Sequence, residues 1–148
     1  MKQAVLVLLA MWLGAALLLV ASVAPAAFDV LPSRTLAGAL VGRVLPVVFI
    51  SGIIVAIPTI WVFAASKWAW IPAGMVFVCC VAAQFQVGPR IAKLRAQIGG
   101  AVDSLPVDDP QRVLFGKLHA TSVAYLGGAI LGAVILLILL LLAMRQRP

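Results

Sequence analysis

The stretch "LHATSVAYLGGAILGAVILLILLLLAM" (Leu118–Met144) decides the fold, because His119 is its only side chain that can carry a charge near neutral pH. The hydrocarbon core of a bilayer is about 30 Å thick, and about 20 residues of α-helix cross it. A run of this length and composition therefore predicts a transmembrane helix.

Three further uncharged runs of sufficient length precede this one. The 148 residues are 65% hydrophobic and 10% charged, with a mean hydropathy of +1.21, and these values lie outside the usual range of soluble domains. We expect an all-α fold, an integral membrane four-helix bundle that forms a single four-span domain over residues 1–148. No tandem repeat is visible in the sequence. The expected spans are 4–25, 44–66, 68–89 and 117–144.

The first span has an alternative interpretation as a secretory signal. Lys2 supplies a positive start, and "APA" (Ala24–Ala26) has the small residues of a cleavage site. The apolar stretch is longer than the ~7–15 residues of a typical signal core, which favours a retained helix.

Two segments carry signals for helix ends. In "VDDPQR" (Val107–Arg112), Asp109 suits the N-cap and Pro110 the first helical position, so we expect the last helix to begin near Pro110. In "IAKLRAQIGG" (Ile91–Gly100), apolar residues recur at helical spacing and two glycines follow. This pattern predicts a short amphipathic helix in the third loop, lying on the membrane surface.

The basic residues indicate an orientation. A four-span arrangement places seven of the 11 Lys and Arg residues in the first and third loops and the other four beside the termini and the second loop. Because basic loops face the cytoplasm, we expect the two longer loops to be cytoplasmic and both termini external, in a bacterial-type plasma membrane. Trp61, Trp68 and Trp70 surround the second loop as an aromatic belt would.

The net charge of +7 fits the membrane lipids that we expect as partners. Basic loops beside anionic headgroups account for it, and no nucleic acid is needed.

The same arrangement collects the polar residues at one membrane face, where the first and third loops lie. We interpret them as a candidate polar rim. His119 and Ser122 share one helix face, and the alternative for His119 is an interfacial side chain that hydrogen-bonds a loop or a headgroup. The candidate rim residues are His119, Ser122, Asp29, Arg34, Arg43, Gln84 and Arg90.

The sequence shows no catalytic constellation, so we do not expect an enzyme, a cofactor or a metal site. A single histidine cannot supply both axial ligands of a haem or three ligands of a catalytic zinc within one chain. Cys79 and Cys80 are adjacent rather than spaced as C-x-x-C, and they are expected to pack as small hydrophobic residues.

Two pairs of glycines predict close helix packing. "GAILG" (Gly128–Gly132) and "GALVG" (Gly38–Gly42) have the G-x-x-x-G spacing that lets two backbones approach closely. We expect the first pair to contact the first or third span of the same chain. A homo-oligomer through Gly128 and Gly132 is the alternative.

Three stretches resemble the transmembrane protein 205-like family, a domain of unknown function. They are "VAPAAFDVLPSRTLAG" (Val23–Gly38), "QVGPRIAKLR" (Gln86–Arg95) and "FGKLHATS" (Phe115–Ser122). The resemblance runs in order from about Gly14 to Gly132 and implies a four-helix membrane protein. It implies no reaction, cofactor or catalytic residue.

These observations favour a small, non-enzymatic membrane protein with a structural, lipid-contacting or accessory role. One alternative is a transporter or permeation component linked to tolerance of metals or toxic compounds. It would need a polar lining through the bilayer, and the spans offer few polar residues. The other alternative is a haem or metal-binding redox protein that uses His119.

Overall fold

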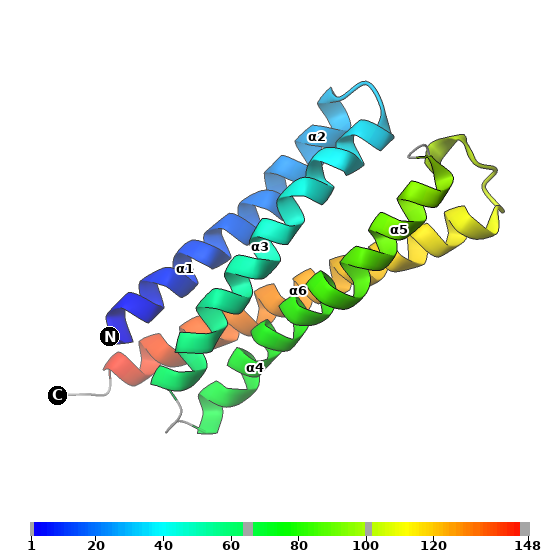
Figure 1. Ribbon diagram of the computed structural model, residues 1–148. Coiled ribbons are helices and arrows are strands. Elements are labelled where there is room, and N and C mark those ends of the chain that lie inside the picture. The colour runs from blue at the N-terminus through cyan, green and yellow to red at the C-terminus, as the bar shows by residue number, and fades with distance from the viewer. Residues whose placement is uncertain (1, 64–66, 100–101, 146–148) are drawn as a thin grey trace.

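Four long helices form the protein, arranged as two helical hairpins (Figure 1). This computed structural model describes residues 2–63, 67–99 and 102–145. The first hairpin comprises α1 (Lys2–Leu18), the π-helix η1 (Leu19–Val23), α2 (Ala24–Val30) and α3 (Arg34–Val62). The second comprises α4 (Lys67–Val81), the π-helix η2 (Ala82–Val87), α5 (Gly88–Ile98), the short 3-10 turn η3 (Val102–Ser104) and α6 (Pro110–Arg145).

The predicted all-α fold with four spans is confirmed. Four helical segments are long and apolar enough to cross a membrane, and the described residues contain no strand. These segments are Lys2–Val30, Arg34–Val62, Trp68–Ile98 and Pro110–Ala143. The protein is therefore a multi-pass integral membrane protein.

The helices extend beyond the predicted spans, whose limits were placed at the first charged residues. Helices of 29 to 34 residues are about 45–50 Å long, whereas the hydrocarbon core is about 30 Å thick. Long basic side chains can reach water from a helix that continues past the core, so a charge does not end the helix. Residues 64–66, the predicted end of the second span, lie outside the described residues.

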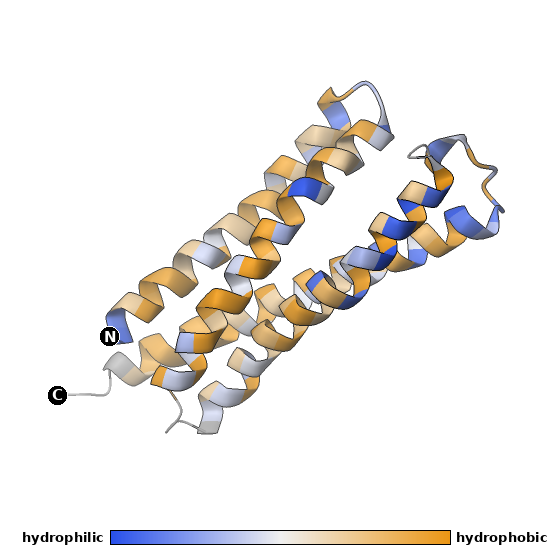
Figure 2. Cartoon of the chain, viewed as in Figure 1, coloured by the Kyte–Doolittle hydropathy of each residue, from blue (hydrophilic) through white to orange (hydrophobic). Residues whose placement is uncertain are grey.

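Both termini lie at one end of the bundle (Figure 1). The opposite end carries the α2–α3 turn and the loop between α5 and α6, and we call it the loop end. Figure 2 shows hydrophilic residues gathered at the loop end and mostly apolar residues along the remaining length of the helices.

The core lies where α1, α3, α4 and α6 pack in a ring, each against two neighbours. Leu9 of α1, Val76 of α4 and Leu136 of α6 are almost completely buried there. A polar contact crosses this core, since Nε1 of Trp12 donates a hydrogen bond to the Val48 carbonyl, 2.9 Å away. Gly52 makes room for the indole, because a β-carbon at Gly52 would stand 3.0 Å from the Trp12 ring.

The glycines of α6 face α4. A β-carbon on Gly132 would stand 2.9 Å from the Pro72 carbonyl oxygen and 3.3 Å from the Val76 side chain. One on Gly128 would stand 3.0 Å from the Cys79 sulfur. This face of α6 is therefore filled by α4 of the same chain.

The π-helices η1 and η2 each precede a proline. The Ala24 N–H donates to the Leu19 carbonyl just before Pro25, and the Gly88 N–H donates to the Ala83 carbonyl just before Pro89. Each bond spans five residues, which widens the turn before a residue that has no N–H to donate. Both helices therefore continue past their prolines.

This continuity corrects one prediction. Residues 88–98 do form a helix, α5, but it extends η2 and α4 along nearly the same line instead of lying separately on the membrane surface (Figure 1). Pro89 suggested a break between the span and the amphipathic segment. The π turn keeps the helix continuous, because the Gly88 N–H bonds to the Ala83 carbonyl just before Pro89, which has no N–H to donate.

The predicted signals at Asp109 and Gly99 do mark helix ends, and Ser33 adds a cap that was not predicted. Asp109 caps α6 by accepting a hydrogen bond from the Gln111 N–H at 2.7 Å, and α6 begins at Pro110. Ser33 caps α3 by accepting from the Leu36 N–H at 3.2 Å. Gly99 ends α5 with a φ of 73°, a left-handed conformation that glycine adopts without strain.

The two hairpins repeat one order of elements: a helix, a π-helix, a second helix that begins beside a proline, a loop and a long helix. Their contacts repeat as well. The pairing of α1 with α3 corresponds to that of α4 with α6, and the pairing of α3 with α4 corresponds to that of α1 with α6. The chain is therefore a structural repeat that its sequence does not reveal.

Candidate functional site

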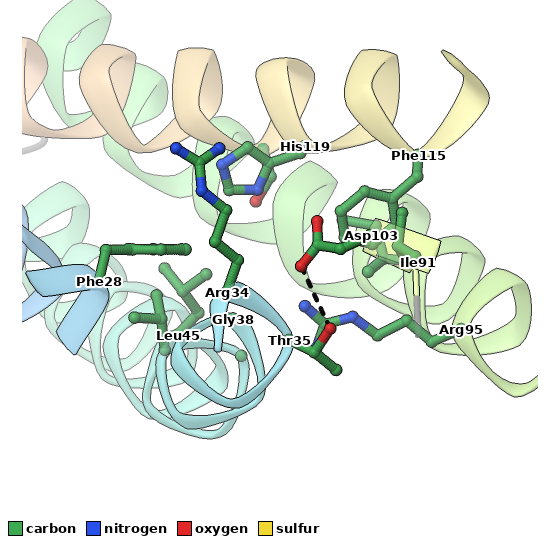
Figure 3. Close-up of a pocket in the computed structure, with 14 residues that line it drawn as sticks. Phe28, Arg34, Thr35, Gly38, Leu45, Ile91, Arg95, Asp103, Phe115 and His119 are labelled. Atoms are coloured by element: carbon green, nitrogen blue, oxygen red, sulfur yellow. Dashed lines mark hydrogen bonds between the residues drawn. The ribbon is translucent and has the colours of Figure 1, made fainter. Parts of the chain in front are cut away.

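The two hairpins enclose a cavity at the loop end. The end of the first hairpin has a small hydrophobic cluster of its own, formed by Ala27, Ala37 and Val41. A cavity of about 280 Å³ lies between this hairpin and the second one. Its lining residues come from α2, α3, α5, η3 and α6 (Figure 3). They are Phe28, Arg34, Thr35, Gly38, Val41, Gly42, Leu45, Ile91, Arg95, Val102, Asp103, Phe115, His119 and Ser122.

A second cavity adjoins the first on the side of the core. Its volume is about 510 Å³, and it shares Gly42, Leu45, Ile91, Arg95 and Ser122 with the first cavity. The rest of its wall includes Pro46 and Phe49 of α3 and Ala83 and Gln84 of η2. The two cavities therefore lie side by side between α3, α5 and α6, and we call them together the groove.

Arg95 separates the two parts of the groove. Its side chain reaches from α5 to α3 (Figure 3), where Nη2 lies 2.8 Å from the β-carbon position of Gly38 and Nη1 lies 3.2 Å from that of Gly42. The guanidinium carbon lies 5.3 Å from the centre of the Phe115 ring, which is cation–π geometry. The Arg95 guanidinium thus packs against two glycines of α3 and the aromatic ring of Phe115.

His119 stands on the opposite wall, on α6. Its ring lies nearly parallel to that of Phe115, one helical turn earlier, with the two centroids 6.4 Å apart. The side chain of Arg34 points from α3 toward His119 (Figure 3). Ser122 is 6% exposed and lines both cavities.

Val102 and Asp103, which follow α5, line the first cavity. Thr35 of α3 donates a hydrogen bond to Oδ2 of Asp103 at 3.2 Å, which connects the two hairpins. Nη1 of Arg112 donates to the Leu105 carbonyl at 2.6 Å and fixes the loop against α6.

The electrostatics of the first cavity are unbalanced. Arg34 and Arg95 contribute two positive charges, and Asp103 contributes one negative charge. The Asp103 carboxylate already accepts a hydrogen bond from the Thr35 hydroxyl. Within residues 2–63, 67–99 and 102–145, neither guanidinium forms an ion pair with a carboxylate. Because Arg95 is half-buried, an anion in the groove would compensate a charge that has lost part of its hydration.

The structure brings together five of the seven predicted rim residues. Arg34, His119 and Ser122 line the first cavity, and Arg43, Gln84 and again Ser122 line the second. Asp29 and Arg90 are exposed and line neither cavity.

The groove residues that the rim prediction missed include Thr35, Arg95, Asp103 and Phe115. Arg95 was assigned to a helix on the membrane surface, and the continuous helix α4–η2–α5 instead turns its side chain toward α3. The available signal was the G-x-x-x-G pair Gly38 and Gly42 at the same end of the bundle. That pair receives the Arg95 side chain and not the backbone of another helix.

Two hydroxyl groups within the spans bond to their own helices. The hydroxyl of Ser51 donates to the Val47 carbonyl at 2.7 Å, and that of Thr59 donates to the Val55 carbonyl at 2.6 Å. In the part of the chain that the structure describes, no group of three or more His, Cys, Asp or Glu residues is placed to hold a metal ion. The chemistry that the loop end supports is recognition of an anion by arginine.

Comparison with known proteins gives one family. The model of the family described as "Domain of unknown function (DUF4149)" matches residues 7–99. The match covers most of α1 and the elements from η1 to α5, and the η3 and α6 parts of the groove wall lie outside it. No curated protein and no solved structure is significantly similar to the chain.

Proposed function

The chain belongs to the DUF4149 family, and on this premise we propose that it is a non-enzymatic accessory protein of a bacterial-type plasma membrane that contacts anionic lipid headgroups through its loop end. The family match supplies no reaction. The resemblance of three stretches to the transmembrane protein 205-like family supports the proposal, since it likewise implies a four-helix membrane protein without catalytic residues.

One observation carries the proposal: the groove at the loop end holds Arg34 and Arg95 without a carboxylate partner in the described residues. Arginine suits this role because its guanidinium stays charged and forms two parallel hydrogen bonds with phosphate oxygens.

The surroundings of the groove support the same function. All seven basic residues of the first and third loops belong to the loop end, as do the four aspartates. Two of these aspartates are engaged, Asp103 with Thr35 and Asp109 at the N-cap of α6. Each basic residue near an anionic membrane surface contributes about 1 kcal/mol of attraction. We assign the loop end to the cytoplasmic face, where anionic lipids are exposed.

The lipid role is favoured over the two alternatives by where polar groups lie. A permeation pathway needs polar atoms facing a lumen, whereas the hydroxyls of Ser51 and Thr59 donate to their own helix. A redox centre at His119 needs further ligands from other residues, and its ring neighbour is Phe115.

The proposal is tested in lipid nanodiscs of phosphatidylcholine with and without phosphatidylglycerol. We expect phosphatidylglycerol to raise the melting temperature of the protein, because a ligand that binds the folded state stabilises it. We expect the gain to shrink as salt is raised from low to physiological ionic strength, since salt screens exposed charges. Equal melting temperatures in the two lipid mixtures at low salt would refute the proposal.

A further inference from the structure

We propose that the groove binds one anionic phospholipid molecule, with its phosphate held between Arg34 and Arg95 and an acyl chain lying in the adjoining cavity. This inference rests on the proposed function and deepens it. General attraction of lipids to a basic surface needs no defined position, whereas the groove defines one for a single molecule.

The first step concerns how the groove would hold the phosphate group. Arg34 and Arg95 approach the first cavity from opposite hairpins, so a phosphate between them would have donors on two sides. The cavity also lies at the first turn of α3, where the helix dipole is positive and favours negative charge. His119 completes the wall beside Arg34 with ring nitrogens that can donate a hydrogen bond.

The second step is the apolar part of the ligand. The second cavity shares five lining residues with the first, and its wall combines apolar residues such as Leu45, Phe49 and Ile91 with the polar residues Arg43 and Gln84. Its volume of about 510 Å³ falls in the range of about 300–1,000 Å³ that small-molecule sites occupy. A free inorganic anion would leave this cavity unused, and an amphipathic molecule would fill both parts.

The third step concerns the depth of the groove relative to the bilayer. Trp61 is 75% exposed at the end opposite the loop end, where a tryptophan marks the membrane interface. Counting about 20 residues back along α3, about 30 Å, reaches Val41. The same count from Trp68 reaches Gly88 on the third span. Gly38 then lies about 5 Å outside the hydrocarbon core, within the layer of phosphate groups. The backbone of Arg95 lies about 10 Å outside the core, and its side chain brings the guanidinium to Gly38.

The fourth step is the backbone around the groove. Ala83 and Gln84 belong to η2 and line the second cavity. Single π turns inside α-helices occur frequently at functional sites. Here the π turn forms part of the wall that would contact the acyl chain.

The test is native mass spectrometry of the detergent-solubilised full chain, which counts the lipid molecules bound to each protein. The probes are phosphatidylglycerol, phosphatidylcholine and, by titration calorimetry, inorganic phosphate and glycerol phosphate. The informative variants are Arg95→Met and Arg34→Met, which keep a long side chain and remove one charge. The matched control is Lys93→Met, because Lys93 is an exposed cation on α5 that lines neither cavity.

We expect one phosphatidylglycerol to bind more tightly than all others and more tightly than phosphatidylcholine. Loss of either arginine should weaken this first binding step about tenfold, as expected for one charge-assisted contact. Lys93→Met should change it by less than about twofold. Neither inorganic phosphate nor glycerol phosphate should bind measurably, because each lacks the chain.

Other outcomes overturn the inference. Equal weakening by Lys93→Met and Arg95→Met would mean diffuse attraction, which removes the site but leaves the proposed function intact. Binding of inorganic phosphate as tight as that of the lipid would remove the acyl-chain part of the site and with it the phospholipid assignment. Equal binding of phosphatidylcholine and phosphatidylglycerol, together with equal melting temperatures in the two nanodisc mixtures, would remove both proposals.

Discussion

Nη2 of Arg95 lies 2.8 Å from the point where a β-carbon on Gly38 would stand. This contact joins the two hairpins at the loop end, and it depends on the absence of a side chain at position 38. The atom in the way belongs to the end of a long, flexible side chain, so the fold can tolerate a methyl group there. The Arg95 guanidinium, however, would have to move to make room for that methyl group.

Gly38→Ala is therefore expected to displace the guanidinium while leaving the fold intact. The melting temperature should stay level or rise slightly, since alanine is favoured over glycine inside a helix by about 0.5–1 kcal/mol. The affinity for phosphatidylglycerol, measured by native mass spectrometry, should fall. Gly116→Ala on α6 is the matched control, because a β-carbon there meets no atom within 4 Å. Equal phosphatidylglycerol affinities of the two variants would count against the role given to Gly38.

Gly132→Ala is expected to destabilise the protein. The new methyl group would stand 2.9 Å from the Pro72 carbonyl oxygen, and a backbone atom in a packed helix cannot move aside cheaply. Overpacking of this kind costs about 1–3 kcal/mol, which should lower the melting temperature in detergent. Gly127→Ala, one residue from Gly128, meets no atom within 4 Å and should have little effect. A Gly132→Ala protein as stable as the parent would contradict the packing described for α4 and α6.

Trp12→Phe removes the donor of the hydrogen bond from α1 to α3 without opening a large cavity. The loss should cost about 0.6 kcal/mol, a typical value for a hydrogen bond between transmembrane helices. The cost is small because the Val48 carbonyl lies in a continuous helix. Thermal unfolding in detergent measures it. Trp61→Phe, at an exposed position, provides the comparison, and a loss of stability as large at Trp61 as at Trp12 would argue against the hydrogen bond as the cause.

The orientation of the bundle gives a further prediction. A reporter inserted after Gly99 should read cytoplasmic, and one fused to the C-terminus should read external, because the first and third loops carry seven of the 11 basic residues. The reverse readings would place the groove on the external face. The four spans would be unaffected.

The ends of helices were predictable because their signals are local. Asp109 with Pro110 fixes where α6 begins, and Gly99 fixes where α5 ends, through backbone geometry set by one or two residues. The four spans were predictable for a similar reason, since bilayer thickness sets a minimum length for an uncharged run.

The groove was only partly predictable, because its geometry depends on distant segments. Pro89 looks like a helix breaker in sequence, and only the π turn before it shows that α5 continues the third span. Once α5 is continuous, Arg95 faces α3 and not the membrane surface. The two G-x-x-x-G pairs show the same limit. Their spacing marks a close approach, but only the packing shows that Gly132 receives a backbone and Gly38 receives a guanidinium.

The repeat of the two hairpins bears on how such a site could arise. In a dimer of identical hairpins, related by a two-fold axis, every groove would occur twice. Joining the hairpins in one chain lets them differ, and they differ at the loop end, where α5 has 11 residues against seven in α2 and α6 has 36 against 29 in α3. The shared core keeps its paired contacts, and the longer hairpin alone supplies Arg95, Phe115 and His119. Two hairpins in one chain can differ in this way, whereas the identical chains of a homodimer cannot.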